Sequence, residues 1–141
     1  MRYWDASALV PLFLAEPASE RMEAVAREDP AIVTWWGTRI ECFSVVSRLE
    51  REGVLPAASV ARATEKLRRA GADWTEVHAT EELRHQAERM LRVHPLRAAD
   101  ALQLAAAVIA AEHRPPQVEF VTLDRRLADA ARREGFGVLG V

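Results

Sequence analysis

Short apolar segments alternate along this chain with longer segments whose apolar residues recur every three or four positions. Apolar runs of three or four residues bounded by turn signals predict strands, and the longer periodicity predicts helices. Strands that alternate with helices indicate a parallel sheet covered on both faces. We therefore predict a single domain, residues 1–141, with the fold of a three-layer α/β/α sandwich around a short, mainly parallel central sheet. The predicted strands are 2–4, 31–34, 74–77, 119–122 and 137–139, and the predicted helices are 8–14, 19–28, 38–52, 56–70, 80–93, 97–112 and 124–133.

Several predicted helix ends carry recognisable signals. Thr38 and Glu41 have the spacing of a capping box, which predicts that a helix opens at Thr38. Gly71 is expected to close the helix that begins near residue 56, and Thr80 is expected to cap the next one. The helix over 97–112 differs from the rest because it is apolar nearly all round, which predicts burial between layers. Asp100 is the one charged residue within its apolar run.

Composition excludes several classes of protein. The chain has 141 residues, of which 50% are hydrophobic and 28% charged, and this balance excludes collagen and wholesale disorder. Cys42 is the only cysteine, so no intramolecular disulfide can form, and we expect a buried thiol in a cytoplasmic protein. No apolar run approaches the roughly 20 residues of a membrane span, and a signal peptide is not expected.

The net charge of −2 is not that of a protein that holds nucleic acid by bulk attraction. Any contact with phosphate must therefore be local. Nearly all the cations are arginines, which suit bidentate contacts to phosphate, although a compositional bias explains them equally well. Lys66 is the only lysine.

Four acidic residues occupy equivalent places in the predicted scheme. Asp5 and Asp124 follow strands, whereas Glu41 and Asp100 lie in the first turns of helices. Since crossover helices run antiparallel to the strands, their N-termini emerge where the strands end, and the four carboxylates can converge at one edge of the sheet. Carboxylates brought close together repel one another, so such a cluster requires cations. Hard oxygen ligands favour Mg²⁺ or Mn²⁺.

Each acid also has a purely structural interpretation. Glu41 can close the capping box, Asp124 can be a helix N-cap, and Asp100 can complement a helix dipole. Asp5 can belong to a turn in which Ser7 acts as the cap. Their joint placement favours a functional role over these separate explanations.

The four acids lie in four sequence motifs. They are Tyr3-Trp4-Asp5-Ala6-Ser7-Ala8-Leu9-Val10, Thr38-Arg39-Ile40-Glu41, Leu96-Arg97-Ala98-Ala99-Asp100-Ala101-Leu102-Gln103-Leu104-Ala105 and Phe120-Val121-Thr122-Leu123-Asp124-Arg125-Arg126-Leu127. In these motifs the sequence resembles the PIN-domain family, and more narrowly the VapC-type toxins of bacterial toxin–antitoxin pairs. The motifs occur in the family's order, and the resemblance spans essentially the whole chain.

This resemblance implies an endoribonuclease that depends on Mg²⁺ or Mn²⁺. It maps Asp5, Glu41, Asp100 and Asp124 onto the family's acidic quartet, and Ser7 and Thr122 onto hydroxyl residues beside the first and last acids. It also implies a homodimer and an antitoxin that inserts a peptide, often with a basic side chain, into the acidic pocket. Candidate RNA contacts are Arg97, Arg125 and Arg126, for which solvated surface positions or ion pairs are the structural alternative.

Two other functions remain open from the sequence. A magnesium-dependent phosphatase would use Asp5 as nucleophile, but the second aspartate expected two residues on is replaced by Ser7. A catalytically silent binding module would keep the fold and the acidic pocket. Trp35 and Trp36 can stack on bases or pack in a loop or core, and the histidines lack the spacing of a zinc site.

Overall fold

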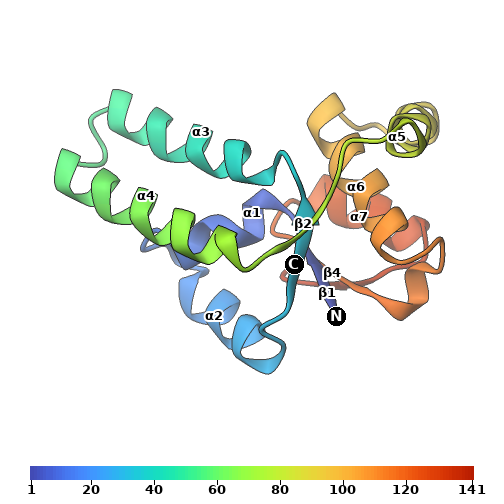
Figure 1. Cartoon of the computed structure of the whole chain (residues 1–141), viewed down its shortest axis with the longest axis horizontal. Coiled ribbons are helices and arrows are strands. Elements are labelled where there is room, and N and C mark those ends of the chain that lie inside the picture. Colours follow the sequence, from blue (N-terminus) through green and yellow to red (C-terminus); the bar gives the residue numbers. More distant parts are fainter.

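Five short strands form one sheet at the centre of the molecule. In the computed structural model, which describes residues 1–141, the strand order is β3-β2-β1-β4-β5 and every neighbouring pair is parallel (Figure 1). The sheet predicted as mainly parallel is thus parallel throughout. The strands are β1 (Arg2–Trp4), β2 (Ile32–Trp35), β3 (Thr75–Val77), β4 (Glu119–Val121) and β5 (Gly137–Leu139).

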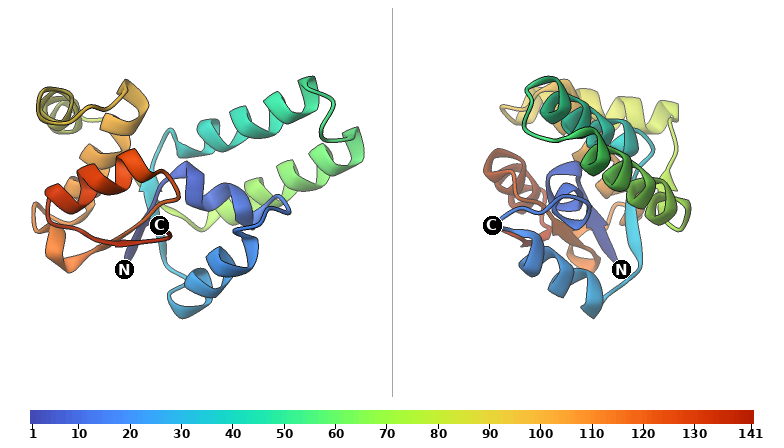
Figure 2. Two further views of the ribbon diagram at one scale, coloured as in Figure 1. Left: turned by 180° about the vertical axis from the view of Figure 1, so that it is seen from behind. Right: turned by 90° about the vertical axis from the view of Figure 1, so that its left-hand side faces the viewer.

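Helices cover both faces of this sheet, as predicted (Figures 1 and 2). One face is covered by α1, α2, α3 and α4 and the other by α5, α6 and α7. Figures 1 and 2 show α3 and α4 as a hairpin whose far end lies away from the sheet. The helices are α1 (Ala6–Leu9), α2 (Ser19–Glu28), α3 (Thr38–Arg51), α4 (Ala57–Ala72), α5 (Glu81–Val93), α6 (Ala98–Ala110) and α7 (Arg125–Arg133), with short 3-10 helices η1 (Val10–Leu12) and η2 (Pro115–Gln117).

The two cores follow from the alternation of side chains along the central strands. Tyr3 of β1 and Phe120 of β4 are fully buried, and their rings stack 5.2 Å apart in the core beneath α5, α6 and α7. The next residues, Trp4 and Val121, point to the opposite face and pack in the core beneath α1 to α4. A strand buried on both faces requires this unbroken apolar sequence.

Helix α6 confirms the prediction made from its apolar sequence. Seven of its 13 residues are buried, and most of these are alanines, whose small side chains allow close approach to the sheet and to α5. Gln103 is the buried exception, at 1% exposed. An amide buried in this way must find hydrogen-bond partners, and it finds them in the candidate site described below.

One predicted cap and one predicted helix end are wrong. The helix predicted to open at Thr38 does begin there, but Gly37 is its N-cap, and no side chain caps it. The Thr38 hydroxyl instead accepts a hydrogen bond from the buried Gln103, so no capping box forms with Glu41. Gly71 does not end α4, which continues to Ala72. The Arg39 side chain packs against this glycine, and it would have to shift for a larger residue, because a Cβ would lie 2.8 Å from its Cδ.

Other elements agree with the prediction to within a few residues, except that the one helix predicted over 8–14 is replaced by α1 and the 3-10 helix η1. Thr80 caps α5, its hydroxyl accepting a hydrogen bond from the Leu83 N–H. Cys42 is buried, and burial raises the pKa of its thiol to about 12, so it stays protonated. None of the helices has the length and apolar character needed to cross a bilayer.

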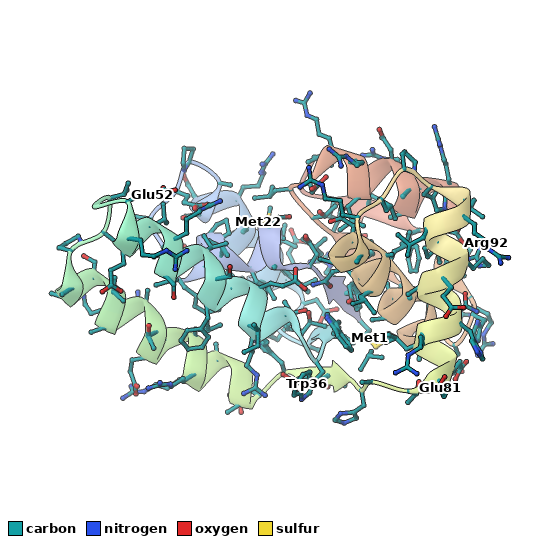
Figure 3. All side chains as sticks on the ribbon, turned by 90° about the horizontal axis from the view of Figure 1, so that it is seen from above. Met1, Met22, Trp36, Glu52, Glu81 and Arg92 are labelled. Carbon is teal, nitrogen blue, oxygen red and sulfur yellow. The ribbon has the colours of Figure 1, made fainter.

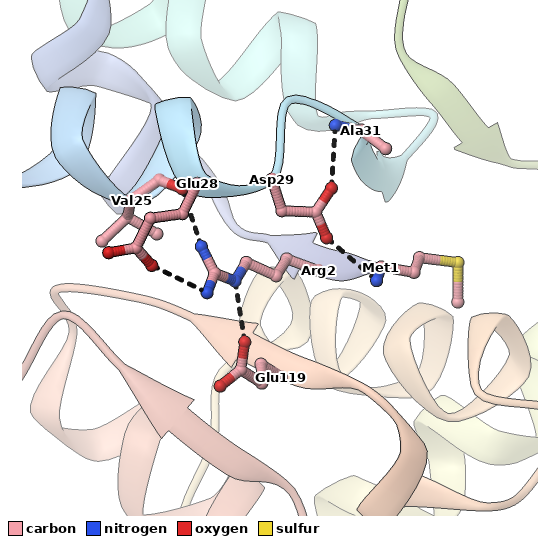
Figure 4. Close-up of polar contacts among 7 residues, drawn as sticks. All are labelled: Met1, Arg2, Val25, Glu28, Asp29, Ala31 and Glu119. Atoms are coloured by element: carbon pink, nitrogen blue, oxygen red, sulfur yellow. Dashed lines mark hydrogen bonds and ion pairs between the residues drawn. The ribbon is translucent and has the colours of Figure 1, made fainter.

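Charges at the amino-terminal edge of the sheet are compensated by their neighbours (Figure 4). The Arg2 guanidinium donates to Glu119 at 2.7 Å, to Glu28 at 3.0 Å and to the Val25 carbonyl at 2.7 Å. These contacts tie β1 to β4 and to α2. At the carboxyl edge of the sheet, by contrast, acidic side chains lack basic partners.

Gly140 fixes the turn that follows β5, and its replacement gives the first prediction. Its φ of +106° disfavours an L side chain, and a Cβ would lie 2.3 Å from the Thr122 carbonyl oxygen. Gly140→Ala is therefore expected to lower the free energy of unfolding by about 2–4 kcal/mol. Urea unfolding of the purified variant measures this loss.

Gly137→Ala is the matched control because Gly137 lies in the same segment, has no positive φ, and has only ordinary contacts around an added Cβ. It should unfold within about 1 kcal/mol of the wild type. Equal losses in the two variants would contradict the proposed steric constraint.

Candidate active site

The four predicted acids lie at the carboxyl edge of the sheet and line one pocket. Asp5 directly follows β1 and Asp124 lies three residues beyond the end of β4, while Glu41 and Asp100 lie in the first turns of α3 and α6. The pocket has a volume of about 610 Å³. Its lining includes Asp5, Ser7, Glu41, Asp100 and Asp124, together with Glu16, Ile40 and Ser44.

Asp5 is held in place by the turn it begins. It is the N-cap of α1, and it receives hydrogen bonds from the Ser7 hydroxyl at 2.8 Å and the Ser7 N–H at 3.2 Å. Asp5 is only 5% exposed. Burial raises the pKa of this carboxyl to about 6, although the hydrogen bonds from Ser7 and Thr122 oppose the rise. The predicted turn is present, with Asp5 rather than Ser7 as the cap.

Glu41 is positioned by the buried amide of Gln103. The Gln103 Nε2 group donates to Glu41 Oε1 at 3.0 Å and to Thr38 Oγ1 at 2.9 Å, and its Oε1 accepts from the Tyr3 hydroxyl at 2.7 Å. Burial raises the pKa of Glu41 to about 7, with smaller contributions from the charges of Asp5 and Asp100, although the hydrogen bond from Gln103 opposes the rise. Burial is therefore the main cause of the raised pKa, and the neighbouring carboxylates add to it.

A chain of hydroxyl groups anchors this amide to the sheet. Thr38 Oγ1 lies 2.7 Å from Thr34 Oγ1, and the Thr34 hydroxyl donates to the Trp4 carbonyl. Both threonines are fully buried. The side chain of Glu41 is thus connected, through Gln103 and two threonines, to the backbone of β1.

Asp100 and Asp124 each bond to the backbone at a helix N-terminus. Asp100 Oδ2 accepts from the Arg97 N–H at 3.2 Å, and Asp124 Oδ1 accepts from the N–H groups of Arg126 and Leu127. The N-cap interpretation of Asp124 is confirmed, and Asp100 lies in the first turn of α6 as its dipole role requires. Both carboxylates also face the pocket, and Asp124 Oδ2 has no hydrogen-bond partner within the chain.

Ser7 and Thr122 connect the loops that carry the first and last acids. Their hydroxyl oxygens lie 3.2 Å apart, Ser7 Oγ accepts from the Leu123 N–H, and Thr122 Oγ1 accepts from the Asp124 N–H. Thr122 is fully buried. Their observed contacts therefore fix the relative positions of Asp5 and Asp124.

No basic side chain lines the pocket, and none of its carboxylates takes part in an ion pair. The candidate RNA contacts Arg97, Arg125 and Arg126 are exposed and lie outside its lining. Arg125 lines a neighbouring pocket of about 540 Å³ with Arg21 and Arg132.

The donor set fits a hard divalent cation. It offers carboxylate oxygens without competing thiol or imidazole groups, and its two most buried carboxyls have pKa values that a nearby cation would lower. No three acidic, histidine or cysteine side chains lie close enough to enclose an ion by themselves. Water or substrate oxygens would complete the coordination, as is usual for Mg²⁺.

The protein is an α/β sandwich with an acidic pocket at the carboxyl edge of its sheet, and comparison with known families agrees with this description. The PIN domain family matches residues 2–133, and the chain belongs to that family. PIN domains are typically nucleases, and these generally use divalent metals. The resemblance seen in the sequence is thereby confirmed at the level of the family.

A solved structure extends this similarity to the whole fold. The chain is similar to a toxin–antitoxin complex from Klebsiella pneumoniae, with a TM-score of 0.63, 16% identity, and coverage of 99% of this chain and 97% of that one. A search of proteins with curated functions found no match.

Sequence reasoning missed two residues of the site. Gln103 carries a signal, since it is a lone amide in an apolar helix and follows Asp100 by three positions, on the same helical face. Glu16 lies in the segment after η1 and lines the pocket as a fifth carboxylate. Nothing in the local sequence distinguishes Glu16 from an ordinary surface acid.

The raised pKa values predict an unusual dependence of stability on pH. The folded-state pKa values, about 6 for Asp5 and about 7 for Glu41, exceed the ordinary values of 3.8 and 4.5. At a pH between the ordinary and the raised value of each group, the folded protein therefore binds more protons than the unfolded chain. Without metal, the free energy of unfolding should increase by about 1–3 kcal/mol as the pH falls from 7.5 to 5. Urea unfolding in chelator at several pH values measures this change.

Glu41→Gln should flatten that profile and stabilise the metal-free protein at pH 7.5, because the amide can still accept from Gln103 and carries no charge. Glu50→Gln is the control, as Glu50 lies on the same helix and is exposed. A metal-free wild type whose stability declines steadily from pH 7.5 to 5 would contradict this interpretation.

Proposed function

We propose that this chain is a metal-dependent endoribonuclease, the toxin of a type II toxin–antitoxin pair. The observation that carries this proposal is a pocket lined by five carboxylates, the four predicted ones and Glu16, and by no basic side chain, in a chain of the PIN domain family. Such a pocket suits a divalent ion and a phosphate better than it suits an uncharged ligand. The similarity in fold to a toxin–antitoxin complex supports the toxin assignment.

In this proposal Asp5, Glu41, Asp100 and Asp124 hold Mg²⁺ or Mn²⁺, some of them through bound water. The cation supplies charge for the phosphoryl oxygens and lets a water molecule ionise near neutral pH. The chain provides no nucleophile of its own. Its carboxylates bind the ion and orient the water against the scissile phosphodiester.

Other side chains of the site act on these carboxylates. Ser7 directs Asp5 by bonding both of its oxygens, and Gln103 holds Glu41 Oε1 in the pocket. Thr122 accepts from the Asp124 N–H and so fixes the start of α7. These residues are positioning residues, because each reaches the reaction only through a carboxylate.

The RNA strand requires cations outside the acidic pocket. Arg125 is placed to provide one, since it follows Asp124 in the chain and shares a neighbouring pocket with Arg21 and Arg132. Arg97 and Arg126 flank the acidic residues along the sequence and remain further candidates. Guanidinium groups would bind phosphates on either side of the cleaved bond.

The proposal also includes protein partners. A cognate antitoxin would inhibit the enzyme by placing a basic side chain among the acids, where it would replace the cation electrostatically. We further propose that the chain acts as a homodimer, and its RNA substrate would place it in the cytoplasm.

The two alternative functions fare differently. A phosphatase with Asp5 as nucleophile is disfavoured, because both Asp5 oxygens accept hydrogen bonds from Ser7 and the only lysine, Lys66, lines a different groove. A catalytically silent binding module would show the same pocket. It is distinguished from the nuclease by the assay that follows.

Asp100→Asn should reduce metal-dependent cleavage of single-stranded RNA at least about 100-fold, because the change removes a metal ligand. The asparagine side-chain oxygen can still accept from the Arg97 N–H, so the fold should be retained. Cleavage of end-labelled RNA by the purified chain with Mn²⁺, with and without chelator, measures the effect.

Asp73→Asn is the control, since Asp73 is exposed at the end of α4 and its side chain makes no hydrogen bond. It should cleave at the wild-type rate. Undiminished cleavage by Asp100→Asn would exclude the proposed site, and a wild type that binds Mn²⁺ but cuts no RNA would favour the binding module.

A further inference from the structure

A second surface next to the acidic pocket carries aromatic and basic side chains, of which Trp36 is exposed and Arg68 has no acidic partner. Trp36, Ile40 and Phe43 form it with Arg39 and Arg68, around a shallow pocket of about 440 Å³ that we call the Trp36 surface. Trp36 is 55% exposed and Ile40 is 65% exposed. Figure 3 shows Trp36 at the margin of the molecule in the view from above.

Trp36 is exposed on a rigid part of the backbone. The backbone N–H of Trp36 donates to the Val77 carbonyl, and this hydrogen bond extends the pairing of β2 with β3 by one residue. The adjacent Trp35 packs against the core, and the two rings meet edge to face with centroids 6.3 Å apart. Exposing a large indole forgoes the stabilisation that its burial would give, so its outward position calls for an explanation.

Ile40 connects this surface to the acidic pocket. Its side chain lines both pockets, and the next residue in α3 is Glu41. A polymer with one phosphate among the four carboxylates would therefore have a neighbouring unit beside Trp36.

The chemistry of the Trp36 surface complements a polyanion with flat bases. The Arg68 guanidinium lies 5.9 Å from the centre of the Phe43 ring, and no acidic residue lines the surface. The Arg39 Nε group is paired with Glu76 at 2.7 Å, so Arg68 is the free cation of the two. Exposed aromatic rings next to arginine are the groups that bind single-stranded nucleic acid by stacking.

We infer that the Trp36 surface binds an unpaired nucleotide of the RNA next to the cleaved phosphodiester, with its base stacked on Trp36 and its phosphate near Arg68. This inference rests on the proposed ribonuclease function and assigns that function a subsite for single-stranded substrate. A second copy of the chain suits the surface less well. A two-fold interface centred there would bring Arg68 close to its own copy, with no acid in the lining to offset the two charges.

The test compares Trp36→Ala, Trp36→Phe and Arg68→Gln with the wild type in steady-state cleavage of a single-stranded RNA with Mn²⁺. Loss of a stacked base should raise KM about 5- to 50-fold for Trp36→Ala with kcat nearly unchanged. Trp36→Phe should recover most of that loss because it keeps an aromatic face, and Arg68→Gln should raise KM and reduce its salt dependence. Leu91→Ala is the control, since Leu91 is an exposed apolar residue on α5, and it should match the wild type.

A second readout does not require cleavage. Titration of the full-length wild type with oligouridylate and Mg²⁺ should quench the fluorescence of Trp36, and Trp36→Phe should remove the quenching. If the wild type cuts no RNA but this quenching is seen, the proposed ribonuclease function fails and the nucleotide subsite stands.

Other results would overturn the inference while leaving the ribonuclease intact. Wild-type KM in Trp36→Ala would show that no base stacks there. Conversion of a dimer into a monomer by Trp36→Ala, measured by light scattering at equal concentration, would show that the surface is an interface between copies of the chain.

Discussion

Burial of carboxylates without a basic partner at one edge of a sheet is the constraint on which this structure depends. Asp5 is buried and Glu41 is partly buried, and burial is the main cause that raises the pKa of each well above its ordinary value. The chain offers no cation to the pocket that they share with Asp100 and Asp124. At the opposite edge, Arg2 is bonded to Glu28 and Glu119, so charge there is balanced within the fold. A divalent ion would balance the acidic edge in the same way.

The supporting residues keep this unfavourable arrangement from relaxing. Ser7 and Thr122 join the loops after β1 and β4, and Gln103 connects Glu41 to the buried Tyr3 and Thr38. Each bond is directed by an element whose own position is set by the two cores. The pocket is therefore built before any ligand arrives, which lowers the cost of ordering the ligands of a metal.

Much of this could be predicted from the sequence, and the failures have physical reasons. Strand and helix alternation gave the three layers, and the positions of Asp5, Glu41, Asp100 and Asp124 relative to the elements predicted a common edge. The capping box failed because the Thr38 hydroxyl bonds to Gln103, 65 residues away, in preference to its own helix. The prediction that Gly71 ends its helix is wrong because this glycine makes room for the Arg39 side chain, a tertiary contact that local sequence does not reveal. Glu16 reaches the pocket through the path of the chain after η1, which local sequence does not encode.

The central claim is that the acidic pocket takes up a cation that compensates its buried and unpaired carboxylates. Calorimetric titration with Mn²⁺ at pH 6.5 in buffers of different ionisation enthalpy tests it most directly. The account predicts binding in the micromolar to millimolar range accompanied by net release of protons, because the cation lowers the raised pKa values of Asp5 and Glu41. No binding at millimolar Mn²⁺, or binding without proton release, would contradict it.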